Sequence, residues 1–234
     1  MVVNRGVEVR DVLSQLEAIP FFAGLDREQL IAIKDRSFIR KYRNNEVIIY
    51  ENEPCIGLFI FLSGSAKIFK TSKDGREQVL YFLGAGDSFG EVPIFDGGGN
   101  PITLLAMEDS YVMIIEKDDF RKIATENSLV ALRTIESLSN RVRKLFSLVE
   151  DLSFNDVGKR LARLLLDMAE EKGVPKGKGV TIDLNMTHQE IAAVVGTVRE
   201  MVSRSLKKLE KGHVIRSNGG EMEILDIEKL RALV

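Results

Sequence analysis

Hydrophobic residues change their spacing twice along the chain, and each change predicts a different kind of structure. Up to Lys34, apolar residues recur three or four positions apart, which predicts two short helices joined by a turn at residues 20–24. Between residues 38 and 115 they form short runs rich in valine, isoleucine and phenylalanine, separated by glycines or Asp-Gly. This pattern predicts an antiparallel sandwich or barrel. The runs cover residues 47–50, 58–62, 66–69, 78–82 and 111–115.

A helical spacing returns after residue 116 and is most regular in one long segment. A short helix over 118–124 is predicted to lead into a longer one over 129–152, whose apolar positions alternate spacings of four and three. A heptad pattern held over three repeats favours a seam between two helices, most simply in a parallel homodimer. The alternative is an amphipathic helix that packs on its own domain. The seam positions are Ile135, Leu138, Val142, Leu145 and Val149.

The last eighty residues predict alternating helices and hairpins. Asp156 is placed to cap the first helix, and Gly173 and Pro175 end it. Gly196 can adopt the left-handed conformation that a short turn between two steeply crossing helices requires. The expected elements are helices over 157–172, 187–195 and 197–211 and hairpins over 176–184 and 214–226.

The last of these helices has a polar face suited to the major groove of DNA. Its positions Val198, Val202, Leu206 and Leu209 are expected to face inward. Arginine on the opposite side can bind guanine, glutamate can accept a hydrogen bond from cytosine N4, and lysines further along can hold phosphates. The preceding helix starts with a capping box from Thr187. The predicted DNA-binding residues are Thr187, His188, Gln189, Arg199, Glu200, Ser203, Arg204, Lys207 and Lys208.

The total charge of the chain conceals this face. With 33 basic and 35 acidic residues the formal net charge is −2, which gives no bulk argument for binding nucleic acid. Residues 185–217, however, contain six basic and three acidic residues. An ordinary solvated helix can have a similar excess of basic residues. Glu200 argues against this interpretation, because an acidic residue on the basic face weakens nonspecific attraction to DNA and is explained if it accepts a hydrogen bond from a base.

The scarcity of cysteine and histidine excludes several kinds of site. Cys55 is the single cysteine, so the chain cannot form an internal disulfide or supply the ligands of a structural zinc or iron–sulfur site. Both histidines, His188 and His213, lie in the last quarter. We therefore expect no metal site. We also expect no enzyme, because the sequence has no arrangement of nucleophile and base and no P-loop. The absence of a long apolar run or leader predicts a cytoplasmic protein that binds no membrane.

Three short motifs are specific enough to compare with a known family. They are the segment 53–64, the triplet Phe89-Gly90-Glu91, and the segment 198–204. In this order they resemble the β-roll signature, the start of the ligand cassette and the recognition helix of the CRP/FNR family of bacterial transcription regulators, and the likeness extends over nearly the whole chain. One departure from the family is the pair Gly212-His213, because family members usually carry glycine or asparagine at the second of these two positions. The sequence therefore leaves open the exact residue at which the helix ends.

The resemblance implies both a fold and a function. The fold is α+β: an antiparallel β-roll like a double-stranded jelly roll over 1–127, a long dimerisation helix and hinge over 128–153, and a winged helix-turn-helix over 154–234. The function is that of a homodimer which binds a palindromic double-stranded DNA operator and contacts RNA polymerase, with an effector in the β-roll. Glu200, Ser203 and Arg204 match family residues that read a TGA-like half-site, and Arg199 matches one that contacts a base or phosphate.

The effector is expected to differ from cyclic AMP. Family members that bind cyclic nucleotides carry an arginine about ten residues after the Gly-Glu pair, but here residues 97–103 read Gly-Gly-Gly-Asn-Pro-Ile-Thr. No lysine or arginine occurs from Glu77 to Glu116, so a buried phosphodiester would lack a cation. The helix positions that would meet a purine are apolar, where nucleotide binders offer hydroxyls. The proposed pocket residues are Gly90, Glu91, Asn100, Thr103, Leu145 and Phe146.

Other effectors and functions stay open. One cysteine excludes the iron–sulfur cluster of the family's oxygen sensors, whereas a neutral or apolar molecule, haem held without histidine, redox chemistry at Cys55 or no ligand all remain. One alternative function is a cyclic-nucleotide-responsive regulator with a divergent cassette. A second is a cupin-like metal-binding enzyme domain fused to a DNA-binding tail, against which the absence of histidine before His188 counts. A third is a small-molecule-binding module whose C-terminal domain contacts proteins. Neither the target genes nor activation or repression follows from the sequence.

Overall fold

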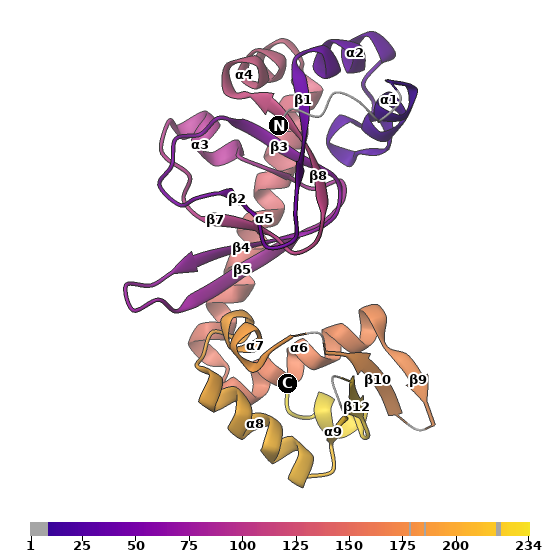
Figure 1. Cartoon of the computed structure of the whole chain (residues 1–234), viewed down its shortest axis with the longest axis vertical. Helices are drawn as coiled ribbons and strands as arrows, with labels where there is room; N and C mark the ends of the chain where they lie inside the picture. Colours follow the sequence, from indigo (N-terminus) through magenta and orange to yellow (C-terminus); the bar gives the residue numbers. More distant parts are fainter. Residues whose placement is uncertain (1–8, 178, 185, 219–220) are drawn as a thin grey trace. The chain divides into compact units, whose positions relative to one another are not determined.

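The chain divides into two compact units, which the computed structural model describes for residues 9–177, 179–184, 186–218 and 221–234 (Figure 1). Unit 1 comprises Met1–Lys70 and Leu80–Leu145, and unit 2 comprises Thr71–Val79 and Phe146–Val234. The long helix α5 (Ser128–Phe154) contributes residues to both. Its predicted bounds, 129–152, fall inside the observed helix.

Two four-stranded antiparallel sheets form the β-roll of the chain, as predicted. Their strand orders are β1-β8-β3-β6 and β2-β7-β4-β5. All five predicted runs are strands, whereas β1, β6 and β7 lie outside them. Charged residues interrupt β1, and β6 is only two residues long. The strands are β1 (Ser37–Tyr42), β2 (Val47–Ile49), β3 (Gly57–Ser63), β4 (Ala66–Thr71), β5 (Glu77–Leu83), β6 (Ser88–Phe89), β7 (Thr103–Ala106) and β8 (Ser110–Glu116).

The central strand β3 is buried on both faces, which explains its uninterrupted apolar run. Leu58 and Ile60 point into a core shared with the N-terminal helices and with helix α4 (Lys117–Glu126). Phe59 and Phe61 point the other way, into the core between the two sheets. Successive side chains of a strand face opposite sides, so both alternating sets must be apolar here.

Helices cover one side of this β-structure. The two N-terminal helices predicted around the turn at residues 20–24 are present, with a short 3-10 helix at Pro20–Phe22. The six-residue helix α3 lies between Gly90 and Gly97 and was not expected from the pattern, because it is too short to show a helical period. The bounds are α1 (Val9–Ala18), α2 (Arg27–Asp35), α3 (Glu91–Asp96) and α4 (Lys117–Glu126).

Unit 2 combines a helix-turn-helix with a small antiparallel sheet of order β11-β12-β10-β9. Helix α6 has the predicted bounds, and Asp156 caps it by accepting a hydrogen bond from the Lys159 amide at 2.9 Å. The short α9 was not predicted, and residues 219–220 of the predicted hairpin turn lie outside the described residues. The elements are α6 (Val157–Lys172), β9 (Val174–Lys176), β10 (Gly179–Asp183), α7 (His188–Val195), α8 (Arg199–Lys211), β11 (Ile215–Asn218), β12 (Glu221–Ile224) and α9 (Ile227–Arg231).

Candidate DNA-binding surface and effector pocket

The helix-turn-helix begins with the predicted capping box. The hydroxyl oxygen of Thr187 accepts from the Glu190 amide at 3.2 Å, and the Glu190 carboxylate accepts from the Thr187 amide at 2.6 Å. Gly196 ends α7 in the left-handed region, with φ of 70°. A Cβ at this position would lie 2.4 Å from the Leu152 side chain, so the turn also needs the space that glycine leaves.

One stripe of α8 is buried in the core of unit 2. Val202, Leu206 and Leu209 are buried, as predicted. The prediction for Val198 needs a correction: it is the N-cap of α8, extended and half-buried, and the helix starts at Arg199 rather than at residue 197. The apolar spacing alone could not distinguish a first helical residue from a cap.

The other side of α8 carries the predicted reading face. Arg199, Glu200, Arg204 and Lys207 are exposed, and Ser203 is half-buried. Among the described residues, none of the four exposed side chains forms an ion pair, so their charged ends are open to a partner. The remaining predicted contacts, Thr187, His188, Gln189 and Lys208, are exposed as well.

The end of α8 explains the unusual Gly212-His213 order. The His213 amide donates to the Glu210 carbonyl and the Val214 amide donates to the Leu209 carbonyl, each at 3.0 Å. These two bonds form a Schellman motif, in which the residue after the cap is left-handed. His213 takes that position with φ of 53°, so the helix ends at Lys211, as the pattern predicted.

A buried ion pair involves Glu91, one of the residues predicted to form the effector pocket of unit 1. Glu91 is fully buried and accepts hydrogen bonds from the Arg141 guanidinium at 2.5 and 3.0 Å. Ser88 donates its hydroxyl to Glu91 at 2.5 Å, and its carbonyl accepts from Arg141. Burial by itself lowers the pKa of Arg141, but the negative charge of Glu91 offsets this effect and the pKa is raised above its ordinary value.

This arrangement corrects the inference that the pocket lacks a cation. The segment 77–116 contains none, but Arg141 enters from α5, fifty positions away from Glu91. Lys144, also on α5, lies 5.9 Å from the ring of Tyr81. In the sequence, Arg141 is adjacent to the seam position Val142. Its position as a basic residue within that apolar repeat was the only sequence signal for its contact with Glu91.

The other predicted pocket residues do not converge on Glu91. The Asn100 amide group donates to the Glu53 carbonyl at 3.0 Å, and the Thr103 hydroxyl accepts from the Glu51 amide at 3.2 Å. Both side chains therefore hold nearby backbone, and no hydrogen bond among the described residues joins them to Glu91. The Asn100 amide oxygen is buried without a partner in that part of the chain. Gly90 is buried with φ of 112°, whereas Leu145 and Phe146 are exposed on α5.

The predicted seam of α5 is an exposed apolar stripe. Ile135, Val142, Leu145 and Val149 have 37 to 60% of their surface exposed, and Leu138 is half-buried. Most of these side chains therefore do not pack on the chain's own core, which argues against the alternative of an intradomain amphipathic helix.

The remaining candidate chemistry is sparse. Burial raises the pKa of the Cys55 thiol above its ordinary value, and its Sγ lies 3.7 Å from the Gly57 carbonyl. The described residues contain no cluster of histidine, cysteine or acidic side chains that could hold a metal ion. Within the same ranges, no helix is both long enough and apolar enough to cross a membrane.

In comparisons with known proteins, each half of the chain matches a known domain family. Residues 39–127 match the cyclic nucleotide-binding domain, and residues 159–233 match the Crp-like helix-turn-helix domain. The cAMP-activated global transcriptional regulator Vfr of Pseudomonas aeruginosa is 33% identical over 79% of this chain and 88% of its own length. The CRP-like cAMP-activated global transcriptional regulator of Mycobacterium tuberculosis is 29% identical over 89% of this chain and 93% of its own length.

Solved structures agree with the fold. A transcriptional regulator of the crp/fnr family from Eubacterium rectale has a TM-score of 0.77 at 25% identity, covering 92% of this chain and 97% of the other. The c-di-GMP responsive global regulator CLP of Xanthomonas campestris has a TM-score of 0.76 at 25% identity, covering 86% of this chain and 99% of the other.

Proposed function

The chain belongs to the CRP/FNR family of transcription regulators, and from this premise we propose that it acts as a homodimer on palindromic DNA, controlled by an effector other than cyclic AMP. Its DNA-binding role as a regulator of this type rests on the family. The observation that carries the proposed mode of binding is the face of α8, where four charged side chains are exposed and without ion pairs among the described residues.

The residues of this face divide into two roles. Arg199, Glu200 and Arg204 lie in the first half of α8, where the side chains of a recognition helix reach base edges. Lys207 lies further along and would hold a phosphate, which adds affinity without sequence information. Glu200 is central to the proposal, because a carboxylate among cations weakens binding to phosphates and is useful only if it accepts a hydrogen bond from a base.

A pair of alanine variants tests this division. Glu200→Ala is expected to relax the preference at one base pair of each half-site by about 1–3 kcal/mol. Lys207→Ala is expected to weaken binding to all sequences alike and to reduce the salt slope by about one. Binding is measured by fluorescence anisotropy on an operator selected from random DNA and on single-base variants of it. Equal loss of specificity in both variants would contradict the assignment.

Homodimer formation is supported by the exposed stripe on α5. An apolar heptad seam buries itself against a second copy, and a two-fold dimer would present two helix-turn-helix units to two half-sites. Palindromic operators mirror this symmetry. Contact with RNA polymerase is part of the same proposal and rests on family membership.

The effector proposal rests on the state of the Glu91–Arg141 pair. Arg141 donates to both carboxylate oxygens of Glu91 and to the Ser88 carbonyl, so its charge is already compensated. Lys70, near the cassette, bonds the Pro101 carbonyl and pairs with Glu51. A cyclic phosphate would have to displace one of these partners to pair with Arg141 or Lys70. A neutral or apolar effector would not, and this is the class we propose.

The names of the relatives favour the opposite outcome, since both sequence relatives described above are cAMP-activated. Titration calorimetry of the full chain with cyclic AMP separates the two functions. We expect no binding at micromolar concentration, and micromolar affinity would refute the effector proposal while leaving the DNA-binding proposal intact. Mass spectrometry and visible absorbance of the purified protein would identify a retained neutral molecule or haem.

A further inference from the structure

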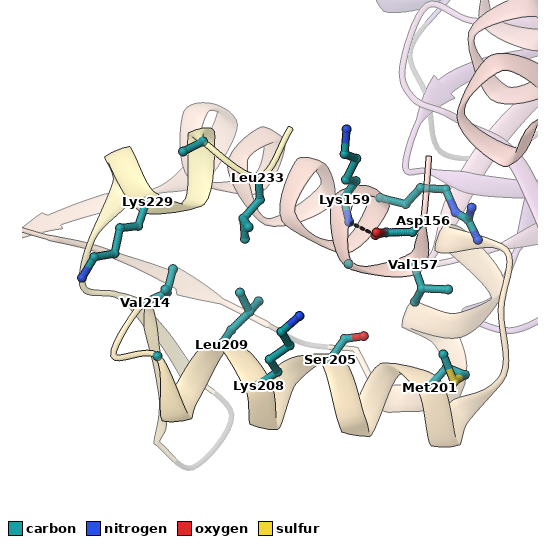
Figure 2. Close-up of a pocket in the computed structure, with 14 residues that line it drawn as sticks. Asp156, Val157, Lys159, Met201, Ser205, Lys208, Leu209, Val214, Lys229 and Leu233 are labelled. Atoms are coloured by element: carbon teal, nitrogen blue, oxygen red, sulfur yellow. Dashed lines mark hydrogen bonds between the residues drawn. The ribbon is translucent and has the colours of Figure 1, made fainter. Parts of the chain in front are cut away.

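A groove of about 940 Å³ lies in unit 2 on the side of α8 away from the reading face. Its walls come from the start of α6, from α8, and from the last residues of the chain around α9 (Figure 2). Side chains of Ser205 and Leu209 point into it from α8, and Leu233 points toward them from the opposite wall. The size is that of a pocket for a small organic molecule.

The walls of the groove combine an apolar surface with positive charge. Apolar contacts come from Val157, Met201, Leu209, Val214 and Leu233. Four basic residues line it against a single acidic one, Asp156. The Asp156 carboxylate is occupied as the N-cap of α6, where it accepts from the Lys159 amide.

Two lysines of the groove have no ion-pair partner among the described residues. These are Lys159 on α6, whose ammonium group points away from the groove, and Lys208 on α8, whose side chain extends into it (Figure 2). The other two basic residues are engaged: Arg160 donates to the carbonyls of Val195, Asn155 and Gly196, and Lys229 pairs with Asp226 at 3.3 Å. The groove therefore has an uncompensated positive charge beside an apolar wall.

We propose that this groove binds a small amphipathic carboxylate, whose apolar body packs against Leu209, Val214 and Leu233 and whose anionic group pairs with Lys208. Charge complementarity selects an anion, because a neutral ligand would leave the Lys208 ammonium group unpaired. The apolar wall selects a ligand with a hydrocarbon body, since an inorganic anion would leave that wall in water.

Such a ligand would affect DNA binding through α8. Lys208 lies between the groove and the reading face, so a carboxylate that holds its ammonium group removes it from any phosphate. The groove residues Met201 and Ser205 also belong to the same helix as Glu200 and Arg204. We therefore expect the ligand to lower operator affinity. This second effect rests on the proposed function, whereas ligand binding itself does not.

Calorimetry of the full chain tests the site directly, with decanoate below its micellar concentration as the probe. Decanoate is expected to bind, and 1-decanol and decyltrimethylammonium to bind at least about tenfold more weakly because they lack the anion. Lys208→Gln should weaken decanoate binding about tenfold. The control Lys159→Gln removes the ammonium group that points away from the groove and should leave decanoate binding unchanged.

The groove itself is tested by Ser205→Phe, which fills it from α8. This variant should abolish decanoate binding, and an unchanged thermal transition shows that the unit is still folded. Equal affinity for decanoate and decanol, or equal binding by wild type and the Lys208→Gln and Ser205→Phe variants, would overturn the proposed site.

The effect on DNA is measured separately by anisotropy on the selected operator. Decanoate should lower the affinity of the wild type several-fold and that of Ser205→Phe not at all. Decanoate binding without any change in operator affinity would overturn the coupling through α8. If the protein preferred no operator, the proposed function would be contradicted. The calorimetric test of ligand binding does not depend on that result.

Discussion

Arg141→Met tests the buried ion pair between Glu91 and Arg141. The substitution keeps an unbranched apolar side chain but leaves Glu91 as an unpaired charge. Glu91 is fully buried and 12% of the Arg141 side chain is exposed, so solvent compensates little of the loss. Removing one partner of such a pair destabilises a protein by about 3–5 kcal/mol, and we expect a decrease of this size in the free energy of unfolding of unit 1.

A second substitution separates the unpaired charge from lost packing. Glu91→Gln in the Arg141→Met background removes the charge and keeps a polar group beside Ser88. We expect this double variant to lie within about 1 kcal/mol of the wild type, because replacing both members of a buried pair is often nearly neutral. The matched control is Glu136→Gln, which breaks the exposed pair with Arg133 on the same helix and should change stability by less than about 0.5 kcal/mol.

Urea denaturation followed by tyrosine fluorescence measures these effects in the right unit. The chain has no tryptophan, and all four tyrosines lie in unit 1, at positions 42, 50, 81 and 111. A loss no larger than that of Glu136→Gln, or one that the second substitution does not reduce, would refute the reasoning.

Three further substitutions or measurements test other parts of the structure. His213→Gly should stabilise unit 2 by about 0.5–1 kcal/mol in thermal denaturation, because glycine adopts the left-handed conformation without strain; a lower stability would argue against the Schellman geometry. Ile135→Asp with Val142→Asp should give monomers in sedimentation velocity, since charges would enter the seam, and an unchanged dimer would move the interface elsewhere. Cys55 should react with iodoacetamide more slowly than free cysteine at pH 7.5, because burial raises its thiol pKa and lowers the thiolate fraction; faster reaction would contradict this.

Local patterns predicted the elements whose determinants lie close together in the sequence. The bounds of α6 follow from Asp156 and Gly173, and the capping box of α7 follows from residues three positions apart. The buried stripe of α8 follows from the helical spacing of its apolar residues, and the polar residues on the opposite side form its reading face. In each case the interacting groups are neighbours along the backbone, so spacing is sufficient to place them.

Long-range placement required the tertiary structure. Nothing in the order of residues connects Arg141 with Glu91. Because the cations were counted only within residues 77–116, the sequence predicted a pocket without a basic residue. The groove behind α8 likewise combines α6, α8 and the end of the chain, which are far apart in sequence. By itself the sequence determined the longer helices, most of the strands and the face that suits DNA. Only the packing of distant elements decided which charges are compensated and where a cavity remains, because burial and charge pairing depend on neighbours in space.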